Sequence, residues 1–184
     1  MNTTVKHFTD ACGDYADCVE LLKAVFKVAK KNAEELAEEM DENAFLAKFD
    51  VSLQAFLLKI AVADGEPSAE ELLFIGTLTD FGDLLLPLDI EWKDLADISK
   101  EQACSLADSA LEAFKGEFLL TVAFVDKLTG KDVYSVLKER MLGITVDLAK
   151  ADSAFRKEEL MCAAKGFMET FDSEYRAHYE DFDE

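Results

Sequence analysis

Apolar residues recur every three or four positions along most of this chain, and that spacing predicts amphipathic helices. The clearest case is residues 15–40, with Asp14 placed to cap the start of the helix. Residues 1–13 before it are predicted to be a loose lead-in or a short helix. The core face of the 15–40 helix is expected to carry Val19, Leu22, Val25, Phe26, Val28 and Ala29.

The same spacing predicts further helices along the rest of the chain, ending in an acidic tail at residues 172–184. Their expected bounds are residues 43–49, 51–63, 69–80, 91–98, 99–114, 117–128, 132–151 and 156–170. Only 8 glycines and 2 prolines occur in 184 residues, which is few for a chain of strands and tight hairpins. The sequence therefore predicts an all-α protein, a single domain over residues 1–184 with about seven to nine helices.

The acidic tail contains three aromatic residues, Tyr175, Tyr179 and Phe182. Aromatic side chains in this position can dock on the body of the protein or on a partner. A tail rich in carboxylates is also compatible with solvent, and the composition favours this solvated alternative.

A twelve-residue stretch at residues 61–72 (AVADGEPSAEEL) returns at residues 149–160 as AKADSAFRKEEL. Each copy is predicted to be a helix, a tight turn and a second helix, with acidic residues at the turn. The flanking apolar positions also correspond: Phe45 and Val133, Phe49 and Leu137, Phe56 and Ile144, Ile60 and Leu148. This internal repeat predicts two pseudo-symmetric helical halves, each carrying one acidic turn.

The two turns supply six candidate metal ligands. If the halves pack about a pseudo-two-fold axis, the turns would face one another. Two carboxylates about 5 Å apart then repel by roughly 3 kcal/mol at an effective dielectric of 20, so the cluster would bind a proton or a cation. Carboxylate ligands suit Mg²⁺, Ca²⁺ or Mn²⁺. The candidates are Asp64, Glu70, Glu71, Asp152, Glu158 and Glu159.

The same carboxylates also fit a purely structural role. Residues 68–71 have the S-x-x-E form of a capping box, in which Ser68 and Glu71 satisfy the free amides of a helix start. Asp-Gly at residues 64–65 is ordinary turn chemistry. The residues alone leave both alternatives open.

Composition and charge narrow the function classes. A formal net charge of -20 opposes binding to nucleic acid and favours divalent cations and basic partner surfaces. No signal peptide is visible, and the longest near-apolar run, residues 118–125, is too short to span a bilayer. We therefore expect a cytoplasmic protein without a transmembrane segment.

The sequence contains no recognisable catalytic motif. Its two histidines, His7 and His178, are far apart, so we expect structural or solvent-exposed roles for both. The four cysteines lack C-x-x-C spacing, and phosphate-binding, nucleophile-elbow and zinc-protease motifs do not occur. We expect a protein that is not an enzyme.

Residues 63–72 (ADGEPSAEEL), after an apolar helix and before Leu-Leu-Phe-Ile at residues 72–75, resemble the signature of the TerB-like (tellurite-resistance B) family. The resemblance covers roughly residues 40–172, with the 15–40 helix packed on that core. It implies an all-helical protein of two related halves, linked to tellurite resistance and stress response in assemblies that include membrane-associated ones. It also implies a divalent metal on Asp64 and Glu71, and on Asp152 and Glu159 in the second copy, with Glu70 and Glu158 as weaker candidates.

The second copy departs from this pattern. Ser153, Phe155 and Arg156 replace the glycine, proline and serine of the first copy, so the turn lacks its glycine and the helix its serine cap. Arg156 would also neutralise part of the acidic cluster. From the sequence we expect a non-enzymatic acidic protein that binds a divalent cation and other proteins; the alternative is a metal-free protein–protein interaction module.

Overall fold

The structure, a computed structural model, describes residues 3–32, 41–63, 65, 67–79, 95, 98–150 and 157–182, and these residues form helices and no strand. The all-α prediction is confirmed. The helices are α1 (Thr3–Asn32), α3 (Glu42–Ala61), α4 (Ala69–Leu78), α5 (Lys100–Thr129), α6 (Val133–Ala149) and α7 (Lys157–Asp181).

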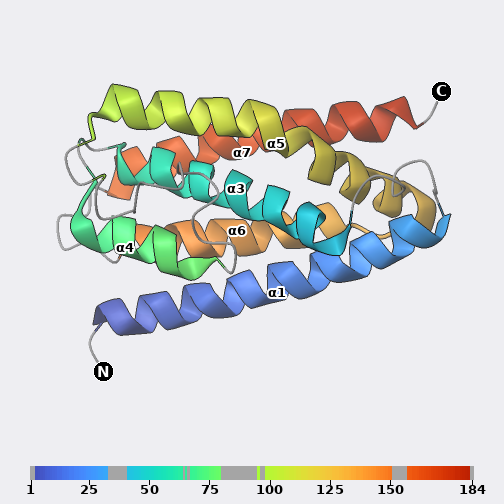
Figure 1. Cartoon of the computed structure of the whole chain (residues 1–184), viewed down its shortest axis with the longest axis horizontal. Coiled ribbons are helices and arrows are strands. Elements are labelled where there is room, and N and C mark those ends of the chain that lie inside the picture. The colour runs from blue at the N-terminus through green and yellow to red at the C-terminus, as the bar shows by residue number, and fades with distance from the viewer. Residues whose placement is uncertain are drawn as a thin grey trace.

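The helices form an elongated bundle in which α3 lies in the middle (Figure 1). α1, α4 and α6 pack on one side of α3, and α5 and α7 lie on the other. α1 also runs along α6, and α6 contacts α7. One continuous core of buried apolar side chains connects all six helices.

α3 is the most enclosed helix, with every residue from Phe49 to Leu58 buried. Two helices, 43–49 and 51–63, were expected here, and that prediction is wrong because the helix continues through Asp50. The Asp50 side chain is only 1% exposed, and both of its carboxylate oxygens accept the Tyr15 hydroxyl of α1, at 3.1 and 3.0 Å. A buried carboxylate with hydrogen-bond donors is compatible with a helix interior.

α1 begins at Thr3, so the predicted start at Asp14 is wrong. The lead-in is helical because it packs on the core: Ala11 is fully buried, and the Phe8 ring meets the Phe74 ring of α4 edge to face at 5.4 Å. Asp14 caps nothing and instead accepts a hydrogen bond from Arg140 of α6 at 2.8 Å. The helix ends at Asn32, and residues 33–40 lie outside the described part of the chain.

α5 is a single helix where the sequence predicted a break at Gly116. Glycine in a helix interior weakens it by about 1 kcal/mol, which burial of Leu111 and Phe118 on either side outweighs. Its predicted start is confirmed, since Ser99 and Gln102 form the expected capping box. Gly130 ends the helix in the left-handed conformation, at φ 65°.

α6 begins at the predicted cap, Asp132, whose side chain accepts a hydrogen bond from the Ser135 amide at 3.0 Å.

The acidic tail is the last part of α7, which continues to Asp181. The prediction of a solvated tail is therefore wrong, and the alternative of a tail docked on the body of the protein is correct. The Tyr175 ring stacks on Tyr134 with ring centroids 4.0 Å apart, and the Phe182 ring meets Phe124 at 5.6 Å.

The predicted helix at 91–98 lies almost wholly outside the described residues. Within the described part of the chain, every helix is too short or too polar to cross a membrane.

Candidate metal centre

Two of the six predicted ligands, Glu70 and Glu71, have described side chains. Asp64 and Asp152 lie outside the described residues, as do the side chains of Glu158 and Glu159. The predicted meeting of the two acidic turns therefore stays a prediction. The matched flanking positions are buried in both copies, from Phe45 at 0% exposed to Val133 at 9%.

Glu71 is buried and forms the predicted capping box of α4. One of its carboxylate oxygens accepts the Ser68 backbone amide at 2.9 Å and the Ser68 hydroxyl at 3.0 Å. The Ser68 hydroxyl in turn accepts the Glu71 amide at 3.2 Å. Glu70 is exposed at the start of the same helix. These contacts account for Glu71 as a cap, whether or not a metal is also bound.

A cation already lies beside the first acidic turn. The Lys100 ammonium group donates a hydrogen bond to the Ala63 carbonyl at 2.6 Å, where α3 has just ended. A positive charge at a helix C-terminus interacts favourably with the helix dipole. In the turn itself Gly65 has φ 145°, a conformation in which a side chain is strained. The second copy has Ser153 at that position, so the two turns are not expected to share one backbone conformation.

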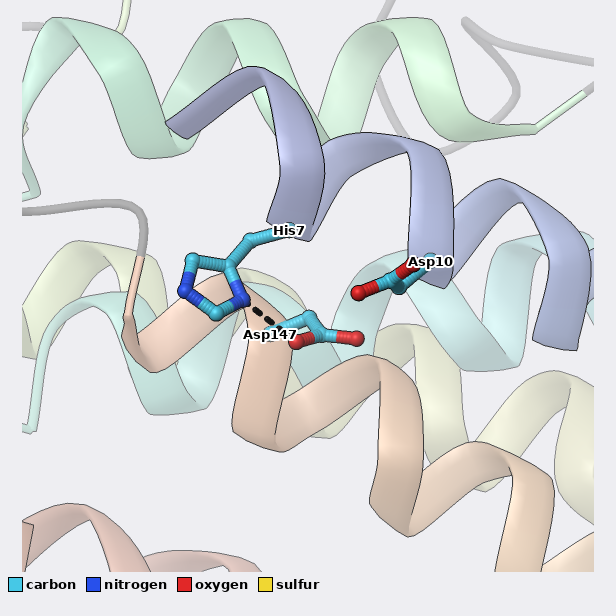
Figure 2. A group of neighbouring side chains, drawn as sticks. All are labelled: His7, Asp10 and Asp147. Carbon is cyan, nitrogen blue, oxygen red and sulfur yellow. Dashed lines mark hydrogen bonds and ion pairs between the residues drawn. The ribbon is translucent and has the colours of Figure 1, made fainter. Parts of the chain in front are cut away.

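The described residues bring together a different set of ligands, His7, Asp10 and Asp147 (Figure 2). One ligand atom from each residue lies within 4.8 Å of the others. His7 Nδ1 donates a hydrogen bond to Asp147 Oδ1 at 2.8 Å, because a carboxylate can only accept. In Figure 2 the Asp10 carboxylate points toward this pair.

The two helices that carry this cluster position it without loops. His7 and Asp10 are three residues apart on α1, so they lie on the same helix face, one turn apart. Asp147 reaches them from the last turn of α6. The side chains of His7 and Asp147 are 15% and 14% exposed, whereas Asp10 is exposed and free to rotate. His7 and Asp147 are thus held by burial and by their mutual hydrogen bond, whereas the exposed Asp10 side chain can adopt another rotamer.

The electrostatics at Asp147 favour a cation. The last turn of a helix presents unpaired carbonyl oxygens, so an anion there is unfavourable and a positive charge is stabilising. α6 has no basic residue in its last turn. The C-cap residue Lys150 carries one positive charge at this helix end, and a protonated His7 or a bound metal ion beside Asp147 would add another.

The donor set indicates which ions would fit. Ligand atoms bonded to one ion at about 2.1 Å lie about 3 to 3.5 Å apart, so a modest rotation of Asp10 would close the cluster. One imidazole nitrogen with two carboxylates suits Zn²⁺, Mn²⁺, Co²⁺ or Ni²⁺. Mg²⁺ and Ca²⁺, which take oxygen ligands, fit less well. Three protein ligands would leave further coordination positions for water.

Sequence reasoning missed this cluster. His7 was expected to have a structural or solvent-exposed role. Residues 1–13 were predicted to be either a loose lead-in or a short helix, so His7 and Asp10 were not placed on one helix face. Their partner Asp147 is 140 residues away in the sequence. The one available signal was the spacing of a histidine and an aspartate at positions i and i+3.

The buried thiol offers no competing chemistry. Cys18 is fully buried, and burial, reinforced by the charge of Asp14, raises its pKa to about 12. Such a thiol stays protonated at neutral pH and is a poor nucleophile and metal ligand. Cys12 and Cys104 are free and half-buried.

No family model, no curated protein and no solved structure matches this chain.

Proposed function

We propose that this protein is a non-enzymatic metal-binding protein in which a divalent transition-metal ion joins α1 to α6. The observation that carries the proposal is the convergence of His7, Asp10 and Asp147 from two helices, with their ligand atoms within 4.8 Å. The formal charge of -20 supports it, because the whole chain attracts cations.

The bound ion would act as a clamp between distant parts of the sequence. It would replace the proton on His7 Nδ1 and neutralise both carboxylates, while its open positions accept water or an anionic group of a partner. The TerB-like resemblance of residues 63–72 supports a related role, a divalent cation in a tellurite or stress-response assembly. In that role the two acidic turns would supply the metal ligands in place of His7, Asp10 and Asp147.

The test is calorimetry and thermal unfolding of the metal-free protein with Zn²⁺, Mn²⁺, Ni²⁺, Mg²⁺ and Ca²⁺. An ion at one hundred times its dissociation constant stabilises the folded state by about 2.7 kcal/mol. For a chain of this size the melting temperature should rise by about 5 to 10 °C. We expect Zn²⁺, Mn²⁺ or Ni²⁺ to give this rise, and Mg²⁺ and Ca²⁺ to give little.

Variants separate the two ligand sets. Asp10→Asn changes an exposed residue, and His7→Gln removes the imidazole; both should abolish the rise. His178→Gln, which removes the other histidine, is the matched control and should keep it. Loss of the rise in Asp64→Asn with Asp152→Asn, but not in Asp10→Asn, would move the site to the acidic turns. An unchanged melting curve with every ion would refute metal binding at both places.

A further inference from the structure

A second feature, independent of the metal cluster, is a groove of about 490 Å³ between α6 and α7. Its floor is apolar: Leu142 and Val146 come from α6, and Met161, Ala164 and Met168 from α7. On each helix these positions are three or four residues apart, so they form two facing strips along the bundle. Met161 is 51% exposed, which leaves a large apolar side chain open to solvent.

The shape and chemistry of this groove match a helical partner. An amphipathic helix binds a groove by placing apolar side chains at positions i, i+3, i+4 and i+7 along such strips. Methionine is flexible and polarisable, so Met161 and Met168 can adapt to side chains of different shape.

The charges of the rim and of the whole chain bear on the charge of the partner. Lys138 on the rim is already paired with Asp172, which also accepts the Tyr134 hydroxyl. That leaves Lys165 and Glu169 as the rim charges without an ion pair among the described residues. The long-range field is set by the whole chain, whose formal charge is -20, and such a field speeds the approach of basic partners.

We propose that the α6–α7 groove binds a basic amphipathic helix of a partner protein, with its apolar face on Met161 and Met168; the net charge of the whole chain, and not the balanced charges of the rim, favours the cations of that helix.

The test uses a synthetic Leu/Lys peptide of about 14 residues, about 21 Å of helix, with leucines at i, i+3, i+4 and i+7. A Leu/Glu peptide of the same pattern is the control for charge. Binding is followed by fluorescence anisotropy of the labelled peptide. The Leu/Lys peptide should bind, more weakly as salt is raised, and the Leu/Glu peptide should not.

Substitutions then test whether the peptide binds in the groove and which charge on the rim favours its binding. Met161→Gln should weaken binding about tenfold, whereas Leu73→Gln on α4, an exposed apolar residue outside the groove, should leave binding unchanged. Lys165→Glu should tighten binding severalfold and Glu169→Lys should weaken it.

Three results would overturn the proposal. The first is equal binding by wild type and Met161→Gln, which would indicate attraction to the acidic surface without the groove. The second is failure of the Leu/Lys peptide to bind. The third is binding of dodecanoate in the groove that is weakened by Lys165→Glu, which would make the ligand an anionic amphiphile instead of a basic helix.

Discussion

Gly143 of α6 lies directly against the Asp14 carboxylate of α1. A β-carbon added at Gly143 would come within 2.2 Å of an Asp14 carboxylate oxygen, closer than any contact allows. Asp14 is held in place by Arg140, one turn before Gly143, which donates to its other oxygen at 2.8 Å. Because residue 143 has no side chain, the Asp14 carboxylate can occupy this position, and an added β-carbon would displace it.

Gly143→Ala should therefore lower stability, although alanine is the better helix former. We expect a loss of about 1 kcal/mol or more from the displaced Asp14 carboxylate. In an Asp14→Ala background the same substitution should instead raise stability by about 1 kcal/mol, the ordinary gain for alanine over glycine in a helix. Urea unfolding of the four proteins measures this coupling.

Gly13→Ala is the matched control in the facing helix, since Gly13 is exposed and nothing lies within 4 Å of an added β-carbon. It should raise stability by up to about 1 kcal/mol in either background. A loss at Gly143 that persists without Asp14 would show that the close contact is not its cause.

Two carboxylates near the α6–α7 contact should respond to pH with opposite signs. Burial raises the pKa of Asp126 and outweighs the hydrogen bonds it accepts from the Tyr134 and Val133 amides and from Tyr175. At Asp172, burial acts in the same direction, but hydrogen bonds from Lys138 and Tyr134 together outweigh it and lower the pKa.

Asp126 therefore adds stability below the ordinary carboxyl value of 3.8, and loses it as pH rises through its higher folded pKa. Asp172 adds stability above 3.8 that disappears as pH falls through its lower folded pKa. Unfolding free energies between about pH 3 and pH 7 should show the advantage of wild type over Asp126→Asn shrinking as pH rises. The advantage over Asp172→Asn should grow over the same range, and parallel curves would contradict the assignment.

Tyr175→Phe tests how firmly the end of α7 is docked. The Tyr175 hydroxyl donates to Asp126 at 3.0 Å, and Asp126 is only 1% exposed, so removal of the donor leaves a buried carboxylate short of one partner. We expect a loss of about 1 to 2 kcal/mol.

Tyr179→Phe is the control, because the ring beneath the Lys127 ammonium group, 4.6 Å away, is retained. It should change stability by less than about 0.5 kcal/mol. Equal losses in the two variants would mean that the hydroxyl of Tyr175 is not what matters.

Substitutions in the capping box of α4 distinguish two roles for Glu71, a helix cap and a metal ligand. Ser68→Ala should lower stability by about 1 kcal/mol. Glu71→Gln should lower it by less, since glutamine also serves in a capping box. Thermal unfolding with chelator and with each metal ion completes the test: a metal-dependent rise that vanishes in Glu71→Gln would make Glu71 a ligand.

The sequence predicted what depends on local pattern. The helical class, the capping boxes at Ser68 and Ser99, and the cap at Asp132 all follow from residues within one turn of each other. Helix ends were misplaced where packing overrides a local signal, as at Gly116 inside α5 and Asp50 inside α3. Tertiary burial compensates a polar residue or a glycine at these positions, and no local pattern reports it.

The candidate site was harder to predict for a related reason. Glu71 was correctly assigned to a capping box because Ser68 lies three residues away. The cluster of His7, Asp10 and Asp147 depends on how α1 lies along α6, a pairing that the internal repeat did not suggest. Asp64 and Asp152 lie outside the described residues, so their separation stays a prediction.

The place of His7 in the first turns of α1 has a practical consequence for anyone purifying this protein. A polyhistidine tag attached before α1 would hold several extra imidazoles next to His7 and Asp10, where they would compete for the ion under study. The end of α7 lies at the opposite end of the bundle from the start of α1 (Figure 1). A tag placed there, or one removed by a protease, keeps the metal measurements free of this artefact.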